Sequence, residues 1–147
     1  MIRFKKLNKE DVSLFMELIK LMETVFGTDP AVINEPYLKK LLAQRNFISI
    51  VAIENDKVLG GLTGYILNMY DSGKSEVYLY DIAVKKEYQR KGMGNKLITA
   101  LHKYCEKRRI GVIFVEALEE DKQAVKFYRK EGGEEQKVIH FNFPLNV

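Results

Sequence analysis

The sequence contains few of the residues from which disulfides and metal sites are built. Its 147 residues include one cysteine, Cys105, and two histidines, so an internal disulfide is excluded and no metal site is expected. No stretch approaches the roughly 18 to 20 apolar residues that span a bilayer. Residues 1–6 lack the apolar stretch of a signal peptide. A cytoplasmic location and no membrane partner are therefore expected.

The sequence also lacks a large excess of charge of either sign, since it has 24 basic residues and 20 acidic ones. A nucleic-acid-binding domain concentrates its basic residues on one element that carries a recognisable motif. The two densest basic segments, 85–91 and 103–109, instead flank a glycine turn and end a predicted helix, where cations complement the helix dipole. No nucleic-acid partner is expected. The length fits one domain, residues 1–147.

The hydrophobic pattern predicts an α/β domain with a mixed sheet. Strands are expected at residues 2–7, 47–53, 58–67, 77–84, 112–115 and 138–143. Helices are expected from an N-cap pair, Asn8 and Asp11, to about 26, then at 36–44, 92–110 and 121–131. Residues 54–57 are expected to form a hairpin turn. The inner face of the first helix is predicted to carry Val12, Phe15, Met16, Ile19 and either Met22 or Phe26.

The strand at 77–84 is almost wholly apolar, which is typical of a central strand. Asp81 is the only residue in it with a charged side chain. An unpaired buried carboxylate is costly, so a binding partner or a function should explain it. We interpret Asp81 as a candidate general base, with a structural carboxylate held by backbone amides or a lysine as the alternative. Strand alternation predicts that it shares a face with Leu79 and Ala83.

A glycine-rich turn follows this strand and opens the next helix. It consists of Gln89, Arg90, Lys91, Gly92, Met93, Gly94 and Asn95. The first turn of a helix has amides without intrahelical acceptors and a partial positive charge. Glycines remove the β-carbons that would keep a ligand away from those amides. The turn therefore predicts an anion site, with a pyrophosphate as the expected ligand.

Two common phosphate motifs do not fit this turn. The dinucleotide fingerprint needs a third glycine where Leu97 stands, and the P-loop needs a lysine where Asn95 stands. The segment resembles instead the Q/R-x-x-G-x-G/A pyrophosphate signature of the GNAT superfamily of N-acetyltransferases. This resemblance implies acetyl-CoA as cosubstrate. It also implies a mostly antiparallel central sheet with a parallel strand pair splayed at the cofactor site, flanked by about four helices. A helix start with no ligand remains the alternative.

A second segment supports the resemblance. Residues 121–133 are similar to the superfamily pattern N-x-x-A-x-x-F-Y-x-x-x-G-F, with Asp121 in place of asparagine and Gly133 in place of phenylalanine. The superfamily also pairs the end of the central strand with the pantetheine arm, as an added strand would pair. The residues implied to bind the cofactor are Ile82, Ala83, Val84, Gln89, Arg90, Lys91, Gly92, Met93, Gly94, Asn95, Asp121 and Ala124.

The strand at 77–84 also resembles the I-Y-I-Y-D-L-A-V strand of the aminoglycoside 3-N-acetyltransferases. Shorter matches, such as residues 35–38 and 138–141, follow in the right order from about residue 25 onward. The resemblance implies transfer of acetyl to a primary amine, with the 3-amino group of an aminoglycoside as one candidate. It assigns Asp81 to the acceptor amine. The superfamily resemblance implies that Tyr128 protonates the departing thiolate, with a core tyrosine on a short amphipathic helix as the alternative. A homodimer is common among such relatives.

A polycationic acceptor would need clustered carboxylates. Glu35, Glu119 and Glu120 are the candidate substrate-binding residues, with Asp29 and Glu116 nearby in the predicted fold. The alternative for Glu119 and Glu120 is a favourable position at a helix N-terminus. Acetylation of a protein N-terminus, a lysine or a metabolite amine remains open. A non-catalytic acyl-CoA-binding or nucleic-acid-binding module is the alternative outside enzymes.

Overall fold

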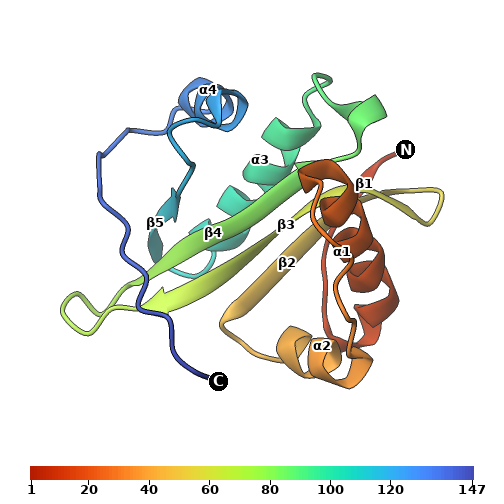
Figure 1. Ribbon diagram of the computed structural model, residues 1–147, viewed down its shortest axis with the longest axis horizontal. Helices are drawn as coiled ribbons and strands as arrows, with labels where there is room; N and C mark the ends of the chain where they lie inside the picture. Colours follow the sequence, from red (N-terminus) through yellow and green to blue (C-terminus); the bar gives the residue numbers. More distant parts are fainter. The chain divides into compact units, whose positions relative to one another are not determined.

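The computed structural model describes residues 1–147, which divide into two compact units, Met1–Glu116 and Ala117–Val147. The first unit contains one five-stranded sheet with its strands in sequence order (Figure 1). The strands are β1 (Arg3–Lys6), β2 (Phe47–Glu54), β3 (Lys57–Asn68), β4 (Ser75–Val84) and β5 (Ile110–Val115). Strands β1 to β4 pair antiparallel, and β4 pairs parallel with β5 because a helix connects them.

The first unit also contains helices α1 (Val12–Phe26), α2 (Glu35–Leu42) and α3 (Met93–Glu106). The second unit contains α4 (Lys122–Lys130). The predicted mixed α/β fold, with four helices and a parallel strand pair, is confirmed. None of the helices has both the length and the apolar character needed to cross a membrane.

The N-cap pair predicted before α1 is present. The Asn8 side chain accepts a hydrogen bond from the Glu10 backbone N–H (2.8 Å), and the Asp11 carboxylate accepts one from the Asn8 backbone N–H (2.9 Å). These two bonds satisfy amides that a helix start leaves without partners. Residues 9–11 form a short 3-10 turn, and α1 follows directly.

The sheet is covered on both faces. In Figure 1, α1 and α2 lie in front of the strands, and α3 lies behind them. The core on the α1 side contains Leu18, Phe47 and Val51, all almost fully buried. On the other side, α3 buries Met93, Leu97, Leu101 and Cys105. The apolar periodicity of each helix therefore gives one buried face, as expected for a three-layer domain.

The buried residues of α1 differ in part from those predicted. The buried set is Val12, Phe15, Leu18, Leu21 and Met22. Met16 and Ile19 are only partly buried, and Phe26 is 46% exposed. Apolar residues cover a wide stripe of α1, so the periodicity alone does not decide whether the side with Met16 and Ile19 or the side with Leu18 and Leu21 is buried. The choice depends on where Leu18 meets the sheet.

Leu18 packs directly onto the backbone of Gly61 in β3. A β-carbon built on Gly61 would lie 2.7 Å from the Leu18 Cδ1 atom and 2.8 Å from the backbone oxygen of Ile50. Real β-carbons do not approach backbone oxygen atoms this closely, so β2 would have to shift. The absence of a side chain at position 61 therefore allows α1 to approach the sheet.

The hairpin between β2 and β3 forms where the sequence predicts it. Asn55 and Asp56, at the centre of the turn, have positive φ angles of 49° and 59°. Two successive positive φ values define the turn type whose twist matches that of paired strands, and asparagine and aspartate tolerate it better than most residues.

The strand predicted at 138–143 is absent, and that prediction is wrong. Residues 134–147 contain neither helix nor strand. The apolar alternation of Val138, Ile139, Phe141 and Phe143 is compatible with a strand. A strand forms only where a neighbouring chain completes its hydrogen bonds, however, and the second unit contains no other strand.

We predict that Gly61→Ala lowers the free energy of unfolding by roughly 1–3 kcal/mol, because the added methyl group overpacks the contact with β2 and α1. Chemical denaturation followed by circular dichroism measures this change. Gly111→Ala in β5 is the matched control, since a β-carbon added there would have its nearest neighbouring atom 3.7 Å away. Equal stability of the two variants would contradict the proposed contact.

Candidate active site

The parallel pair β4–β5 separates part of the way along β4. Pairing runs from Ser75 opposite Ile110 to Leu79 opposite Val115, and it stops there. Of the remaining residues of β4, Asp81 to Val84 pair with β3 only, and Tyr80 has no partner in the register of either neighbour. Their other edge therefore has backbone groups with no partner strand, a position at which an extended ligand can add as a strand. Ile82, Ala83 and Val84, predicted to bind the cofactor, lie in this segment.

A β-bulge sits at the point where β4 leaves β5. Thr63 of β3 lies opposite Asp81, but the next residue, Gly64, lies opposite Leu79, so Tyr80 is the extra residue. Neighbouring residues of β3 point to opposite faces, and so Asp81 and Leu79 do too. The expectation that Asp81 shares a face with Leu79 is wrong, because simple alternation does not include the bulge. Ala83, opposite Gly61, does lie on the Asp81 face.

Asp81 is half-buried, and no hydrogen bond or ion pair engages its carboxyl group. Burial alone raises the pKa of this group above its ordinary value. A structural carboxylate held by backbone amides or a lysine is therefore not what the structure shows. A carboxyl group that is costly to bury and has no structural partner is a candidate for function.

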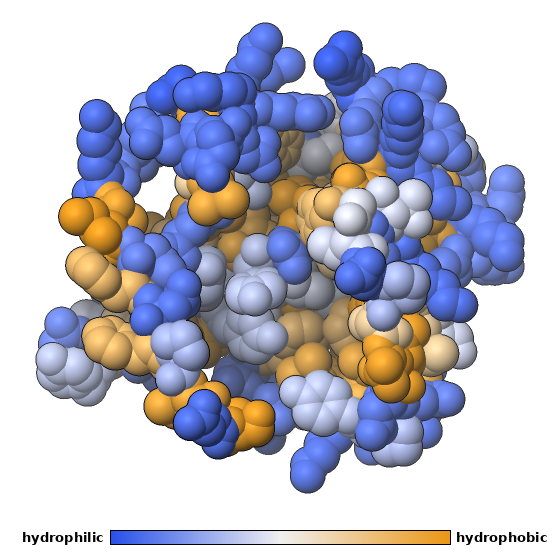
Figure 2. All heavy atoms as spheres, in the orientation of Figure 1, coloured by the Kyte–Doolittle hydropathy of each residue, from blue (hydrophilic) through white to orange (hydrophobic).

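Tyrosines surround Asp81 on the α1–α2 side of the sheet. Burial raises the pKa of Tyr65, and the charges of Tyr80, Tyr37 and Asp81 raise it further. The Tyr65 and Tyr80 rings meet edge-on at 5.8 Å, and Tyr80 is 56% exposed at the bulge. Figure 2 shows residues of intermediate hydropathy over β3 and β4, viewed from the side opposite α3. We call the contacting rings of Tyr65, Tyr78 and Tyr80 the aromatic floor, and Tyr80 is its exposed member.

Tyr78 links this floor to the end of β5. Its ring stacks on Phe114 at 4.9 Å, and its hydroxyl donates a 2.5 Å hydrogen bond to the Glu116 carboxylate. That hydrogen bond, followed by burial, raises the pKa of Tyr78 to about 12. Tyr78 therefore stays protonated and keeps one oxygen of Glu116 in place. Of the carboxylates suggested near Asp81, Glu116 lies in the same neighbourhood, since both carboxylates act on Tyr78.

The aromatic floor was not singled out from the sequence. Three tyrosines in two apolar strands are compatible with an ordinary core. The hairpin register, in which Tyr65 lies opposite Tyr78, could have indicated that they share a face. The bulge adds Tyr80 to that face, and no residue pattern in the sequence predicts the position of the bulge.

The glycine turn after β4 has the geometry expected of an anion site. Gly92 is the N-cap of α3 with φ +80°, no side chain caps the helix, and nothing lies within 4 Å of its missing β-carbon. The Gln89 side chain donates a 2.8 Å hydrogen bond to the Val84 carbonyl, which fixes the turn against the strand. Arg90, with φ +60°, is exposed beside it. The start of α3 thus has amides that no side chain caps, free space at Gly92 and an exposed positive charge nearby.

The second unit contains the other predicted residues. The Asp121 side chain accepts a 3.1 Å hydrogen bond from the Ala124 backbone N–H and so caps α4, a role for which aspartate and asparagine serve equally. Tyr128 lies in α4 with its ring 5.3 Å from that of Phe127. Gly132, with φ +91°, follows the end of the helix. The role of Tyr128 stays a prediction.

The acidic candidates are all exposed. Glu119 and Glu120 lie just before α4, where a helix dipole favours negative charge, and Glu35 is the first residue of α2. Their contact with an acceptor stays a prediction. Cys105 is buried on α3, and burial raises the pKa of its thiol to about 11. It is therefore a neutral core residue and not a nucleophile.

These features match one family. Residues 15–133 match the model of the acetyltransferase (GNAT) family, and the chain belongs to this family. It is an N-acetyltransferase, as the glycine turn predicts.

Several solved structures are similar to this chain. An aminoglycoside acetyltransferase from an uncultured soil metagenomic sample, crystallised with trehalose and with sisomicin, is 37% identical to this chain. The match covers 99% of this chain and 97% of that protein, with a TM-score of 0.95. A second aminoglycoside acetyltransferase from such a sample is 31% identical, with 99% of both chains covered and a TM-score of 0.89. An aminoglycoside N-acetyltransferase in complex with CoA shares the fold at 17% identity, with 98% and 95% of the chains covered and a TM-score of 0.82.

We predict that Asp81→Asn raises the melting temperature by a few degrees at pH 7. The folded protein holds the Asp81 proton more tightly than the unfolded chain, since burial raises the pKa from 3.8. The carboxyl group therefore supports folding best below pH ~4, and that support is lost as the pH rises through the folded-state pKa. The amide keeps the shape without the charge.

Differential scanning fluorimetry between pH 4 and 8 measures the effect, and the gap between variant and wild type should narrow as the pH falls. Asp71→Asn, in an exposed turn, should change the melting temperature little at any pH. An Asp81→Asn protein that melts below the wild type at pH 7 would mean that the carboxylate has stabilising partners.

Proposed function

We propose that the chain, acting as one domain over residues 1–147, transfers acetyl from acetyl-CoA to a primary amine of an aminoglycoside. The observation that carries the proposal is the position of Asp81. It is an unpartnered, half-buried carboxyl group where β4 separates from β5, with the open strand edge on one side and the aromatic floor on the other. A base is needed there, between a thioester donor and an amine acceptor.

The residues present fit acetyl-CoA. The uncapped start of α3, the open space at Gly92, and the charge of Arg90 suit a pyrophosphate. The unpaired edge of Ile82 to Val84 suits an amide-containing arm, since backbone groups there lack a partner strand. Acetyl-CoA supplies the acetyl group as a thioester. In this proposal Gln89, Lys91, Met93, Gly94 and Asn95 complete the turn that holds it, and Asp121 and Ala124 act through the start of α4.

Asp81 and Tyr128 have opposite roles in the proposed transfer. An ammonium group must lose a proton before its nitrogen can attack, and the Asp81 carboxylate accepts that proton. Its raised pKa brings it closer to the working pH, where a general base is most efficient. Tyr128 donates its hydroxyl proton or a hydrogen bond to the departing thiolate, and a phenol of pKa ~10 needs its surroundings for this.

The aromatic floor supports an aminoglycoside as acceptor. Such a molecule offers several ammonium groups and flat sugar faces, and exposed Tyr80 can contact both. The carboxylates of Asp81 and Glu116 lie beside the tyrosines, and Glu35, Glu119 and Glu120 are the outer candidates. The relatives at 37% and 31% identity are aminoglycoside acetyltransferases, one of them crystallised with sisomicin. The 3-amino group is one candidate position. A peptide or metabolite amine is the competing acceptor.

We predict acetyl-CoA-dependent thiol release with sisomicin or gentamicin, because polyamine sugars supply the charges and faces that the site can contact. The assay panel includes spermidine, single amino acids and a basic peptide, which have amines but no sugar rings. Mass spectrometry and NMR of the product identify the acetylated nitrogen. Turnover of the peptide alone would refute the aminoglycoside acceptor and leave the acetyltransferase assignment intact.

We predict that Asp81→Asn lowers kcat by about 10²–10⁴-fold, the usual contribution of a general base. Tyr128→Phe should lower kcat without shifting the acidic limb of the pH profile, which belongs to Asp81. Both variants should bind CoA with nearly wild-type affinity by calorimetry, since neither removes a group from the glycine turn.

The matched controls are Asp71→Asn and Tyr70→Phe, at exposed positions in the β3–β4 turn. They make the same chemical changes and should keep wild-type kcat. Unchanged turnover in Asp81→Asn would remove Asp81 from the mechanism, and loss of CoA binding in that variant would assign the residue to the cofactor instead.

A further inference from the structure

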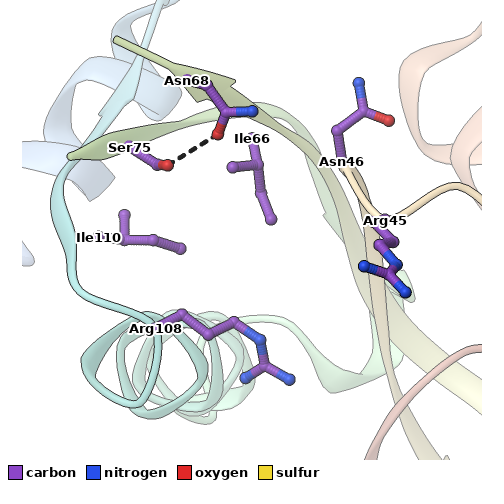
Figure 3. A pocket seen from close by; sticks show the side chains of 7 residues that line it. All are labelled: Arg45, Asn46, Ile66, Asn68, Ser75, Arg108 and Ile110. Atoms are coloured by element: carbon purple, nitrogen blue, oxygen red, sulfur yellow. Dashed lines mark hydrogen bonds between the residues drawn. The ribbon is translucent and has the colours of Figure 1, made fainter. Parts of the chain in front are cut away.

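A hollow lies at the end of the sheet opposite the glycine turn. There β2, β4 and β5 begin and β3 ends, so the hollow is separated from the glycine turn by the whole length of β4, roughly 30 Å of strand. Its volume is about 220 Å³. Figure 3 shows the side chains that line it, which are those of Arg45, Asn46, Ile66, Asn68, Ser75, Arg108 and Ile110.

The charged side chains of this hollow all have the same sign. Arg45 precedes β2 and Arg108 follows α3, and both guanidinium groups project to the same side of the opening in Figure 3. No acidic residue is among the lining side chains. The three ion pairs of the chain involve neither arginine. Two guanidinium groups therefore share one hollow without a counter-charge from the protein.

Arg108 is held in position from behind. Its guanidinium carbon lies 3.8 Å from the centre of the Tyr104 ring, and its Nη1 atom donates a 3.3 Å hydrogen bond to the Tyr104 carbonyl. A guanidinium has five N–H donors, so several remain for a ligand. Stacking and this one bond reduce the side-chain freedom that binding would otherwise cost.

The polar neutral side chains also present donors. The Asn68 amide oxygen accepts a 2.9 Å hydrogen bond from the Ser75 hydroxyl. This bond orients the amide and leaves its NH₂ group available. Asn46, at the start of β2, adds a second carboxamide, and its backbone carbonyl accepts a 2.7 Å hydrogen bond from the Ile66 N–H. The Asn68 amide is thus the neutral donor that a hydrogen bond fixes at the hollow, and Asn46 lies at its rim with its carboxamide turned outward (Figure 3).

The surroundings carry further positive charge. The Lys6 ammonium lies 5.6 Å from the centre of the same Tyr104 ring. Burial lowers the pKa of Lys6, and the nearby Arg108 charge lowers it further. The two positive groups near this ring repel each other, and an anion beside them would relieve that repulsion.

We propose that this hollow binds a small oxyanion, a phosphate or carboxylate group carried by a free small molecule, between Arg45 and Arg108. Guanidinium groups bind such groups through paired, charge-assisted hydrogen bonds. The Asn68 carboxamide adds a neutral donor, and Ile66 and Ile110 line the apolar part of the hollow. The site is independent of the proposed acetyl transfer, since it lies at the opposite end of β4.

The test is a titration of the protein, saturated with CoA so that the glycine turn is occupied. Inorganic phosphate, succinate and chloride are added separately at constant ionic strength, and two-dimensional ¹H–¹⁵N NMR follows the Asn68 side-chain amide and the Ile110 backbone amide. Phosphate or succinate should cause saturable shifts, and the stronger of the two identifies the source. Chloride should cause none.

The double variant Arg45→Gln with Arg108→Gln should bind at least roughly tenfold more weakly, the equivalent of one charge-assisted hydrogen bond. The control Lys40→Gln with Lys107→Gln removes the same net charge from exposed positions outside the hollow and should bind as the wild type does. If the double variant fails to fold, Arg45→Gln alone serves, because Arg45 makes no hydrogen bond or ion pair. Absence of saturable shifts, or equal affinity in the arginine variants, would overturn the proposal.

Discussion

The feature on which the rest of the site depends is the unequal pairing of β4. As far as Leu79 the strand is hydrogen-bonded on both edges, and beyond it on one edge only. Backbone groups that have no partner in the protein must be satisfied by water or by a ligand. The separation of β4 from β5 therefore leaves an open edge inside a continuous sheet, and this is where we propose that the cofactor binds. The same strand leads from that edge into the glycine turn at 89–94 and then into α3.

The bulge at Tyr80 determines which side chains lie beside this edge. One extra residue turns Asp81 toward the α1–α2 side and exposes Tyr80 next to it. The fold accepts a half-buried carboxyl group that no partner stabilises, with its pKa raised by burial. Natural proteins retain such costs mainly where the group has a function. Tyr78, by contrast, is held in place by its hydrogen bond to Glu116 and by stacking on Phe114, so this part of the aromatic floor is fixed.

The two ends of the sheet present different groups to a ligand. At the C-terminal end of β4 the groups are backbone amides and a carboxylate beside tyrosines. At its N-terminal end they are the guanidinium groups of Arg45 and Arg108, with Tyr104 behind one of them. Both arginines are exposed at the molecular surface, so binding there depends on how well the stacking on Tyr104 and the Asn68–Ser75 hydrogen bond fix the donors. Overall charge is nearly balanced, and it is the local distribution that separates these environments.

The sequence by itself determined the elements that depend on local chemistry. The N-cap of Asn8, the hairpin turn at 54–57, the apolar strand 77–84 and the glycine turn 89–94 each follow from residues close together in the chain, and each is where the pattern predicts it. Only the tertiary structure decided which face of α1 is buried, that a bulge moves Asp81 away from Leu79, and that residues 138–143 form no strand. These features depend on partners distant in sequence: Gly61 for Leu18, Thr63 for Asp81, and a neighbouring strand for the C-terminal segment. The apolar periodicity of a segment limits which helix or strand it can form and which face it can bury. The distant segment that it packs against or pairs with decides which of these structures forms.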